Sequence, residues 1–154
     1  MNAEPTSIRR ARVGERDALE RLQRRSSVHE PMYRAQLVAH PDAIDLPAEQ
    51  ITAGHVRVAE RDGVVVGFAV LLERCGDACE LDGLFVEPGR MRAGVGRGLV
   101  ADAKRIARER GARRIDVVAN PQAVAFYEAV GFTSVGETQT RFGPAPRMSL
   151  PIAS

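Results

Sequence analysis

Residues 80–110 read ELDGLFVEPGRMRAGVGRGLVADAKRIARER, and the rest of the chain is organised around them. The stretch opens as a predicted strand in which Glu80 and Asp82 alternate with β-prone apolar residues, namely Leu81, Leu84, Phe85 and Val86. Pro88 ends the strand, and a basic loop leads into the glycine-rich run at residues 94–98. An amphipathic helical pattern follows and ends at Gly111. The sequence therefore predicts a glycine-rich loop that feeds the N-terminus of a helix.

A helix start of this kind binds anions. Its first N–H groups have no partner within the helix, and the helix dipole adds about half a positive charge there. Glycine lets a phosphate approach the backbone closely, while Arg90, Arg92 and Arg97 lie in or beside the loop and can donate charge-assisted hydrogen bonds. The segment thus predicts a diphosphate ligand, cradled by the amides of residues 92–98.

Two other ligand-binding loops have similar glycine spacing. Gly89 and Gly94 have the separation of a P-loop, but Val and Gly follow where Lys and Ser or Thr are required, so this interpretation fails. Gly94 and Gly96 fit the dinucleotide fingerprint, yet Leu99 replaces its third glycine. Asp116 lies where a ribose-binding acid would be found, which keeps that second alternative open, although weak.

The order of strand, V-x-P, basic loop, G-x-G and helix resembles the acyl-coenzyme A binding motif of the GNAT family of N-acetyltransferases. The family pattern [Q/R]-x-x-G-x-[G/A] corresponds to residues 91–96, with Met91 in place of the usual Gln or Arg. Arg90 or Arg92 is the candidate for the missing charge. The resemblance implies acetyl-coenzyme A as cosubstrate, no metal, and cofactor contacts from Leu84, Phe85, Val86, Arg92, Ala93, Gly94, Val95, Gly96, Arg97 and Gly98.

A second signature lies at residues 120–132, NPQAVAFYEAVGF. Core packing of a short helix would explain its aromatic residues. The pattern N-x-x-A-x-x-F-Y-E-x-x-G-F also resembles the second motif of the same family, in the same order along the chain. By this resemblance Asn120 and Phe126 line the cofactor side of the site, and Tyr127 is the general acid that protonates the leaving thiolate.

The remaining segments predict an α/β fold with a mixed sheet. Asp62-Gly63 lies between two β-rich runs, residues 56–60 and 64–72, and marks a hairpin. Residues 114–119 form a strand that must be parallel to the central one, because a helix connects the two. Further elements are expected at residues 7–13 (strand), 14–25 (helix), 32–39 (short helix), 122–130 (helix), 133–137 (strand) and 147–152 (strand). The sum is a GNAT-like sheet of six or seven strands with helices on both faces, in one domain spanning residues 1–154.

Composition narrows the class of protein. The chain has 154 residues, 44% hydrophobic and 27% charged, with a net charge of +2, which argues against a nucleic-acid partner. No apolar run is long enough to span a membrane, and no secretory signal is evident. Cys75 and Cys79 do not form a C-x-x-C pair and are interpreted as reduced thiols, so a cytoplasmic location is expected.

Acyl transfer from a thioester needs a base for the attacking amine. Glu80 or Asp82 on the central strand is the candidate, directly or through water, although each fits an ordinary polar strand face equally well. Gly83 is compatible with a bulge or with the close approach of a ligand. The function expected from the resemblance is transfer of an acetyl group to a primary amine by direct attack. The alternative is a non-catalytic module of the same fold that binds or senses acyl-coenzyme A.

The acceptor is expected to be a small cationic amine. Residues 29–49 and 139–146 are left to line its entrance, and the first segment is locally acidic, with Glu30, Asp42, Asp45 and Glu49. A solvated acidic connector is an equal alternative. For the assembly, a monomer and a homodimer both stay open.

Overall fold

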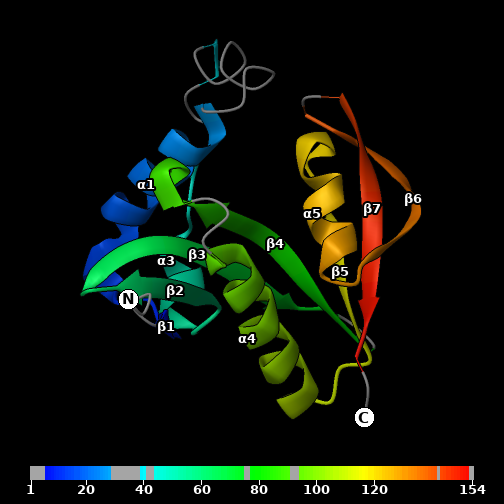
Figure 1. Ribbon diagram of the computed structural model, residues 1–154, viewed down its shortest axis with the longest axis horizontal. Coiled ribbons are helices and arrows are strands. Elements are labelled where there is room, and N and C mark those ends of the chain that lie inside the picture. The colour runs from blue at the N-terminus through cyan, green and yellow to red at the C-terminus, as the bar shows by residue number, and fades with distance from the viewer. Residues whose placement is uncertain are drawn as a thin grey trace. The chain divides into compact units, whose positions relative to one another are not determined.

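The computed structural model describes residues 6–28, 39–40, 44–74, 77–90, 94–141 and 143–152 (Figure 1). The strands of this part of the chain are β1 (Ser7–Arg10), β2 (Val56–Arg61), β3 (Val64–Glu73), β4 (Ala78–Val86), β5 (Arg114–Val118), β6 (Thr133–Thr140) and β7 (Gly143–Pro151). The helices are α1 (Arg16–Val28), α3 (Ala48–Thr52), α4 (Val95–Glu109) and α5 (Val124–Ala129), with the 3-10 turns η1 (Val13–Glu15), η3 (Pro88–Arg90) and η4 (Pro121–Ala123).

The strands form one sheet in the order β1-β2-β3-β4-β5-β7-β6. The β4–β5 pair is parallel, whereas β1–β2, β2–β3, β5–β7 and β6–β7 are antiparallel. A mixed sheet with helices was predicted, and it is confirmed with seven strands. The chain divides into two compact units, the first comprising Met1–Val70 and Gly83–Leu99, the second Leu71–Asp82 and Val100–Ser154.

In the first unit, the β2–β3 hairpin turns at Asp62 and Gly63. Both residues have positive φ angles, 54° and 74°, as a primed two-residue turn requires, and this explains the Asp-Gly pair. The hairpin supplies much of the core of this unit, including Val56, Val58 and Phe68, each with no exposed surface. The expected hairpin is therefore confirmed.

Helix α1 covers part of the same core through Leu19 and Leu22, which are 1% and 2% exposed. A helix was predicted from residue 14. This helical segment instead begins with the 3-10 turn η1 and becomes α-helical at Arg16. Of the short helix predicted at residues 32–39, all but Ala39 lies outside the described residues.

Helix α4 begins earlier than the sequence predicted. Gly96 and Gly98 were expected in a loop, but both lie in the first turn of the helix, which starts at Val95. Burial explains the difference, because Val95 and Leu99 are each 1% exposed and bury this turn in the first unit. At the other end, Gly111 donates to the carbonyl oxygen of Arg108 and Ala112 to that of Ala107, at 3.0 and 2.9 Å, which closes the helix as a Schellman motif.

In the second unit, β4 and β5 pair in parallel with Ala78 opposite Arg114 and Leu81 opposite Val117, as the helical crossover required. Helix α5 lies alongside β7 in Figure 1, and a Cβ added at Gly131 would lie 3.0 Å from Leu150 of that strand. The predicted helix at residues 122–130 is split into η4 and the shorter α5. Among the described helices, none is long and apolar enough to cross a membrane.

Candidate functional site

The start of α4 presents three backbone amides that have no acceptor inside the helix, those of Val95, Gly96 and Arg97. Gly94 precedes them with a φ of 84°, a left-handed conformation that glycine adopts at little cost. The amide of Gly98 donates to the carbonyl oxygen of Gly94 at 3.0 Å and is thus committed to the helix. The predicted cradle of amides therefore lacks Gly98 as a donor, while the three preceding amides and the positive end of the dipole remain available to an anion.

Close packing holds this helix start in place. A Cβ added at Gly67 on β3 would lie 2.9 Å from the carbonyl oxygen of Phe85 and 3.0 Å from Cγ1 of Val95. A Cβ added at Gly98 would lie 3.7 Å from Ile8 of β1, so this glycine faces the packed strands. Gly67 was not among the predicted residues. An isolated glycine within the apolar run VVVGFAV was the signal that could have found it.

The basic loop before α4 is described only in part. Arg90 ends η3 and is exposed, as is Arg97 on the first turn of α4. Arg92 and Ala93, predicted to contact the cofactor, lie outside the described residues together with Met91. That Arg90 or Arg92 supplies the charge missing at Met91 stays a prediction.

The C-terminal part of β4 carries apolar side chains that are only half-buried, although β4 is the central strand in the order of the sheet. These residues are Leu84, Phe85 and Val86. The ring of Phe85 lies 5.2 Å from that of Phe68, centroid to centroid. A Cβ added at Gly83 would lie 2.7 Å from Cε2 of Phe85, so the glycine accommodates this ring. Partly exposed apolar residues on a central strand suit contact with an extended ligand, and a bulge at Gly83 stays a prediction.

Two carboxylates follow each other on one side of β4 within the second unit. Glu80 forms an ion pair with Arg74 and has a side chain that is 25% exposed. Asp82 is exposed, yet partial desolvation, together with the negative charge of Glu80, raises its pKa above the ordinary aspartate value. Arg74 acts in the opposite direction on Asp82. Of the two predicted bases, Asp82 is thus the better proton acceptor, because Glu80 is engaged with an arginine.

Tyr127 on α5 is the most buried of the predicted site residues in the second unit, at 6% exposure. Its ring makes edge contacts with Phe126 and Phe132, each at a centroid distance of 5.3 Å. Burial raises the pKa of Tyr127 to about 12. No hydrogen bond of the buried Tyr127 hydroxyl is found among the described residues, although buried polar groups usually have a partner.

Asn120 lies between β5 and η4. Its side-chain oxygen accepts a hydrogen bond from the amide of Gln122 at 2.8 Å and so caps the turn. This leaves the side-chain NH2 group as the donor for a ligand. Phe126, next to Tyr127, is half-buried.

The predicted residues fall into two groups, one in each unit. The first unit brings together the apolar end of β4 and the start of α4, through the contacts at Gly67. The second unit holds Glu80, Asp82, Asn120, Phe126 and Tyr127, and within it Glu80 adjoins Asp82 and Phe126 adjoins Tyr127. The two acidic residues of the acceptor segment that the structure describes are Asp45 and Glu49. Asp45 pairs with Arg16 at 3.0 Å, whereas Glu30 and Asp42 lie outside the described residues.

The model of the acetyltransferase (GNAT) family matches residues 17–132 of the chain. No curated protein matches it. Among solved structures, a nourseothricin acetyltransferase is 30% identical over 64% of this chain, with a TM-score of 0.58. That match covers 65% of the other chain, which is under two thirds of its length.

Two further solved structures are similar over nearly the whole chain. The PaiA N-acetyltransferase from Thermoplasma acidophilum, in complex with coenzyme A, is 17% identical, with 96% of this chain and 99% of that chain covered and a TM-score of 0.76. The ribosomal-protein-S18-alanine N-acetyltransferase from Escherichia coli is 20% identical, with 97% and 96% covered and a TM-score of 0.70. At these identities the likeness shows the fold.

Proposed function

The chain belongs to the acetyltransferase (GNAT) family, and on this premise we propose that it transfers the acetyl group of acetyl-coenzyme A directly to a primary amine. The observation that carries the proposal is the buried Tyr127 hydroxyl, which has no hydrogen-bond partner among the described residues. Such a group costs stability when it is unpaired, by about 1–3 kcal/mol. A role toward a substrate atom accounts for its retention.

In the proposed reaction, the amine nitrogen attacks the thioester carbonyl carbon, a carbon–nitrogen bond forms and the carbon–sulfur bond breaks. The amine must first lose a proton, which Asp82 accepts directly or through water. Partial burial raises the pKa of Asp82, and the negative charge of Glu80 raises it further, so Asp82 is a stronger base than an ordinary aspartate. The reaction therefore needs no covalent enzyme intermediate.

Tyr127 acts on the leaving sulfur. Its pKa of about 12 keeps the hydroxyl protonated at neutral pH and available as a donor. A thiol in water has a pKa of about 8.5, so full proton transfer from Tyr127 to a hydrated thiolate is uphill. Desolvation raises the pKa of the thiol as well, and the hydrogen bond from Tyr127 stabilises the charge that develops on sulfur before the proton moves.

The diphosphate of the cosubstrate is assigned to the start of α4. The amides of Val95, Gly96 and Arg97 supply the donors, and the exposed Arg97 adds charge, with Arg92 as a further candidate. Leu84, Phe85 and Val86 supply apolar surface for the extended arm of the same molecule, and Asn120 supplies an NH2 donor.

For the acceptor we propose a small cationic amine. The pairing of Asp45 with Arg16 reduces the negative charge that this segment offers, so the proposal rests on its remaining acidic residues and on a relative named for acetylation of nourseothricin. The name of the S18-alanine enzyme makes a peptide N-terminus the competing acceptor class. We also propose a cytoplasmic location. Light scattering would distinguish a monomer from a homodimer.

The test measures thiol release from acetyl-coenzyme A against a panel of acceptors. The panel contains nourseothricin, polyamines, aminoglycosides, free amino acids and a peptide with an N-terminal alanine. Turnover with a cationic small molecule and none with the peptide supports the proposal. Tight binding of acetyl-coenzyme A without turnover on any acceptor would instead indicate the non-catalytic module.

A further inference from the structure

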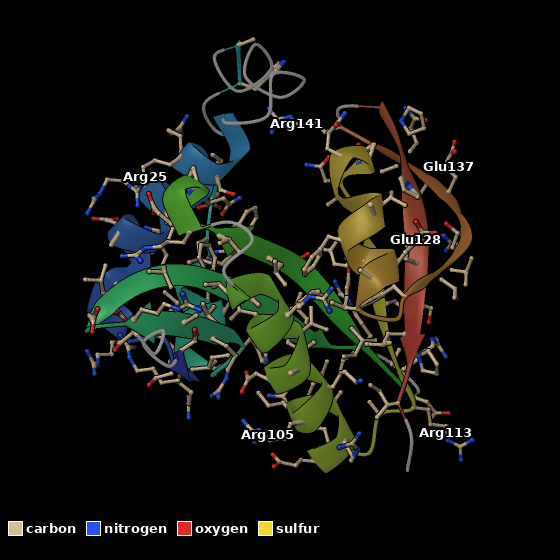
Figure 2. All side chains as sticks on the ribbon, in the orientation of Figure 1. Arg25, Arg105, Arg113, Glu128, Glu137 and Arg141 are labelled. Carbon is tan, nitrogen blue, oxygen red and sulfur yellow. The ribbon has the colours of Figure 1, made fainter. Side chains whose placement is uncertain are left out.

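Arg25 and Glu87 form a two-point ion pair in the first unit. Nε of Arg25 donates to Oε1 of Glu87 at 2.8 Å, and Nη2 donates to Oε2 at 2.7 Å. This parallel arrangement is the strongest geometry open to an arginine and a carboxylate. Arg25 lies in the last turns of α1 (Figure 2), and Glu87 follows the last residue of β4. The pair therefore joins two segments that lie 62 residues apart in the sequence.

The backbone around Glu87 is fixed on both sides. Its amide donates to the carbonyl oxygen of Val66 on β3 at 2.8 Å, and its carbonyl oxygen accepts from the amide of Arg90 at 2.8 Å. From Glu87 the chain enters η3 and the basic loop, and then reaches Gly94 at the start of α4. The side chain of Glu87 is thus the point at which α1 can hold the segment that leads to the start of α4, where the diphosphate is assigned.

The charge of Glu87 also requires compensation. The hydrogen bonds from Arg25, more than any other cause, lower the pKa of Glu87, so the carboxylate stays ionised. A bare carboxylate in the segment before α4 would repel a diphosphate at the start of that helix, whereas the Arg25–Glu87 pair carries no net charge. The pair is half-exposed, with side chains 50% and 28% exposed, and surface pairs are usually worth little for stability. The pair therefore matters for where it lies, between α1 and the segment that follows β4, rather than for its contribution to stability.

We propose that Arg25 is a positioning residue for coenzyme A, which acts by holding and neutralising Glu87 in the segment that leads to the start of α4. This inference rests on the proposed function, because it concerns the same cosubstrate. Arg25 touches no reacting atom in the proposal, so its effect falls on cosubstrate binding rather than on the chemical step.

The experiment measures the Kd of coenzyme A by calorimetry at one fixed ionic strength, with the unfolding midpoint of every variant as a check on folding. Arg25→Ala is expected to raise Kd on the order of three- to tenfold, the latter equivalent to about 1.4 kcal/mol. Arg25→Lys keeps the charge but loses the two-point geometry, and is expected to recover only part of the affinity. Arg25→Ala combined with Glu87→Gln is expected to bind better than Arg25→Ala alone, because the uncompensated carboxylate is gone.

Arg105→Ala is the matched control. Arg105 pairs with Asp102 and Glu109 on the same helix, α4, so its loss removes an arginine and its ion pairs without freeing a distant segment (Figure 2). Its Kd is expected to equal that of the wild type. In steady state, Arg25→Ala is expected to raise KM for acetyl-coenzyme A while kcat stays within about twofold of wild type.

The outcomes are distinguishable. Wild-type protein that does not bind coenzyme A refutes the proposed function and this inference with it. Wild-type binding together with an unchanged Kd in folded Arg25→Ala overturns the inference alone. Full recovery by Arg25→Lys, or a double variant no better than Arg25→Ala, also contradicts it, since the first removes the need for geometry and the second the role of the Glu87 charge.

Discussion

Tyr127 is held by the rings of Phe126 and Phe132, while its hydroxyl has no partner among the described residues. Packing and chemistry can therefore be separated by one substitution. Tyr127→Phe keeps both ring contacts and removes only the oxygen. It should lower kcat about 10²–10⁴-fold, the range for loss of a general acid, with the Kd of coenzyme A nearly unchanged.

Stability supplies the internal control for Tyr127→Phe. Deleting a buried hydroxyl that makes no hydrogen bond within the described part of the chain should leave the thermal midpoint unchanged or raise it. A simultaneous fall in midpoint and activity would mean that the hydroxyl supports the fold. Wild-type kcat in a stable variant would reduce Tyr127 to a core aromatic.

Asp82 determines the acid limb of the rate profile in this proposal. The base must be ionised, so kcat/KM should fall as the pH drops through the pKa of Asp82, which lies above that of an ordinary aspartate. Asp82→Asn should lower the neutral plateau about 10²–10³-fold and remove this limb. Glu80→Gln removes a negative charge that raises the Asp82 pKa, so it should shift the limb to lower pH with a smaller loss of rate. An identical limb in Asp82→Asn would assign the base elsewhere.

At the scale of single residues, the sequence predicted local turns, but it did not predict ion pairs between residues that lie far apart in the chain. The turn at Asp62 and Gly63 could be predicted from the sequence, because its positive φ angles are accessible to few residue types. The Arg25–Glu87 pair left no trace in the sequence, since any of the chain's many arginines and acidic residues could have paired. Likewise, the ion pair with Arg74 that distinguishes Glu80 from Asp82 became evident only in three dimensions.

Among the elements, α4 and β7 show how tertiary packing overrides local preference. Two glycines at the start of α4 predicted a loop, but burial of Val95 and Leu99 stabilises a helix there. A strand was predicted at residues 147–152, whereas β7 begins at Gly143 and so includes Pro144 and Pro146. The amide of Ala119, just beyond the end of β5, donates to the carbonyl oxygen of Pro146. The nitrogen of Pro146 points to this same side of β7, where β5 has already ended and no N–H donor is needed, so a proline fits there.

The start of α4 also makes the phosphate assignment testable. Gly96→Val places a branched side chain beside the three available amides within a helical turn. It should raise the Kd of acetyl-coenzyme A at least tenfold, about 1.4 kcal/mol. Gly14→Val is the matched control, because an added Cβ at Gly14 of η1 meets no atom within 4 Å. Equal affinity in the two variants, measured by calorimetry, would remove the anion site from this helix.

For the molecule as a whole, resistance to acid depends on carboxylates that arginines keep ionised. Arg9 of β1 donates to both Glu15 oxygens, at 2.9 and 2.8 Å, and also pairs with Glu60 of β2. The hydrogen bond from Arg9 is the largest cause that lowers the pKa of Glu15. Arg25 lowers the pKa of Glu87 in the same way, whereas the raised pKa of Asp82 has the opposite effect on stability.

The sign of the pH dependence follows from these directions. A carboxyl group whose pKa is lowered by folding contributes its full stability above its unfolded pKa, near 4.5 for Glu15, and loses it as the pH falls through the folded value. Glu15→Gln should therefore cost about 1 kcal/mol at pH 7, or roughly 2–4 °C in the thermal midpoint, and progressively less at pH 4 and below. Glu137→Gln, on the exposed strand β6 (Figure 2), should follow the wild-type curve at every pH. Thermal midpoints of wild type and Glu15→Gln that run parallel from pH 7 to pH 3 would show that the Arg9–Glu15 pair contributes nothing to the pH dependence of stability.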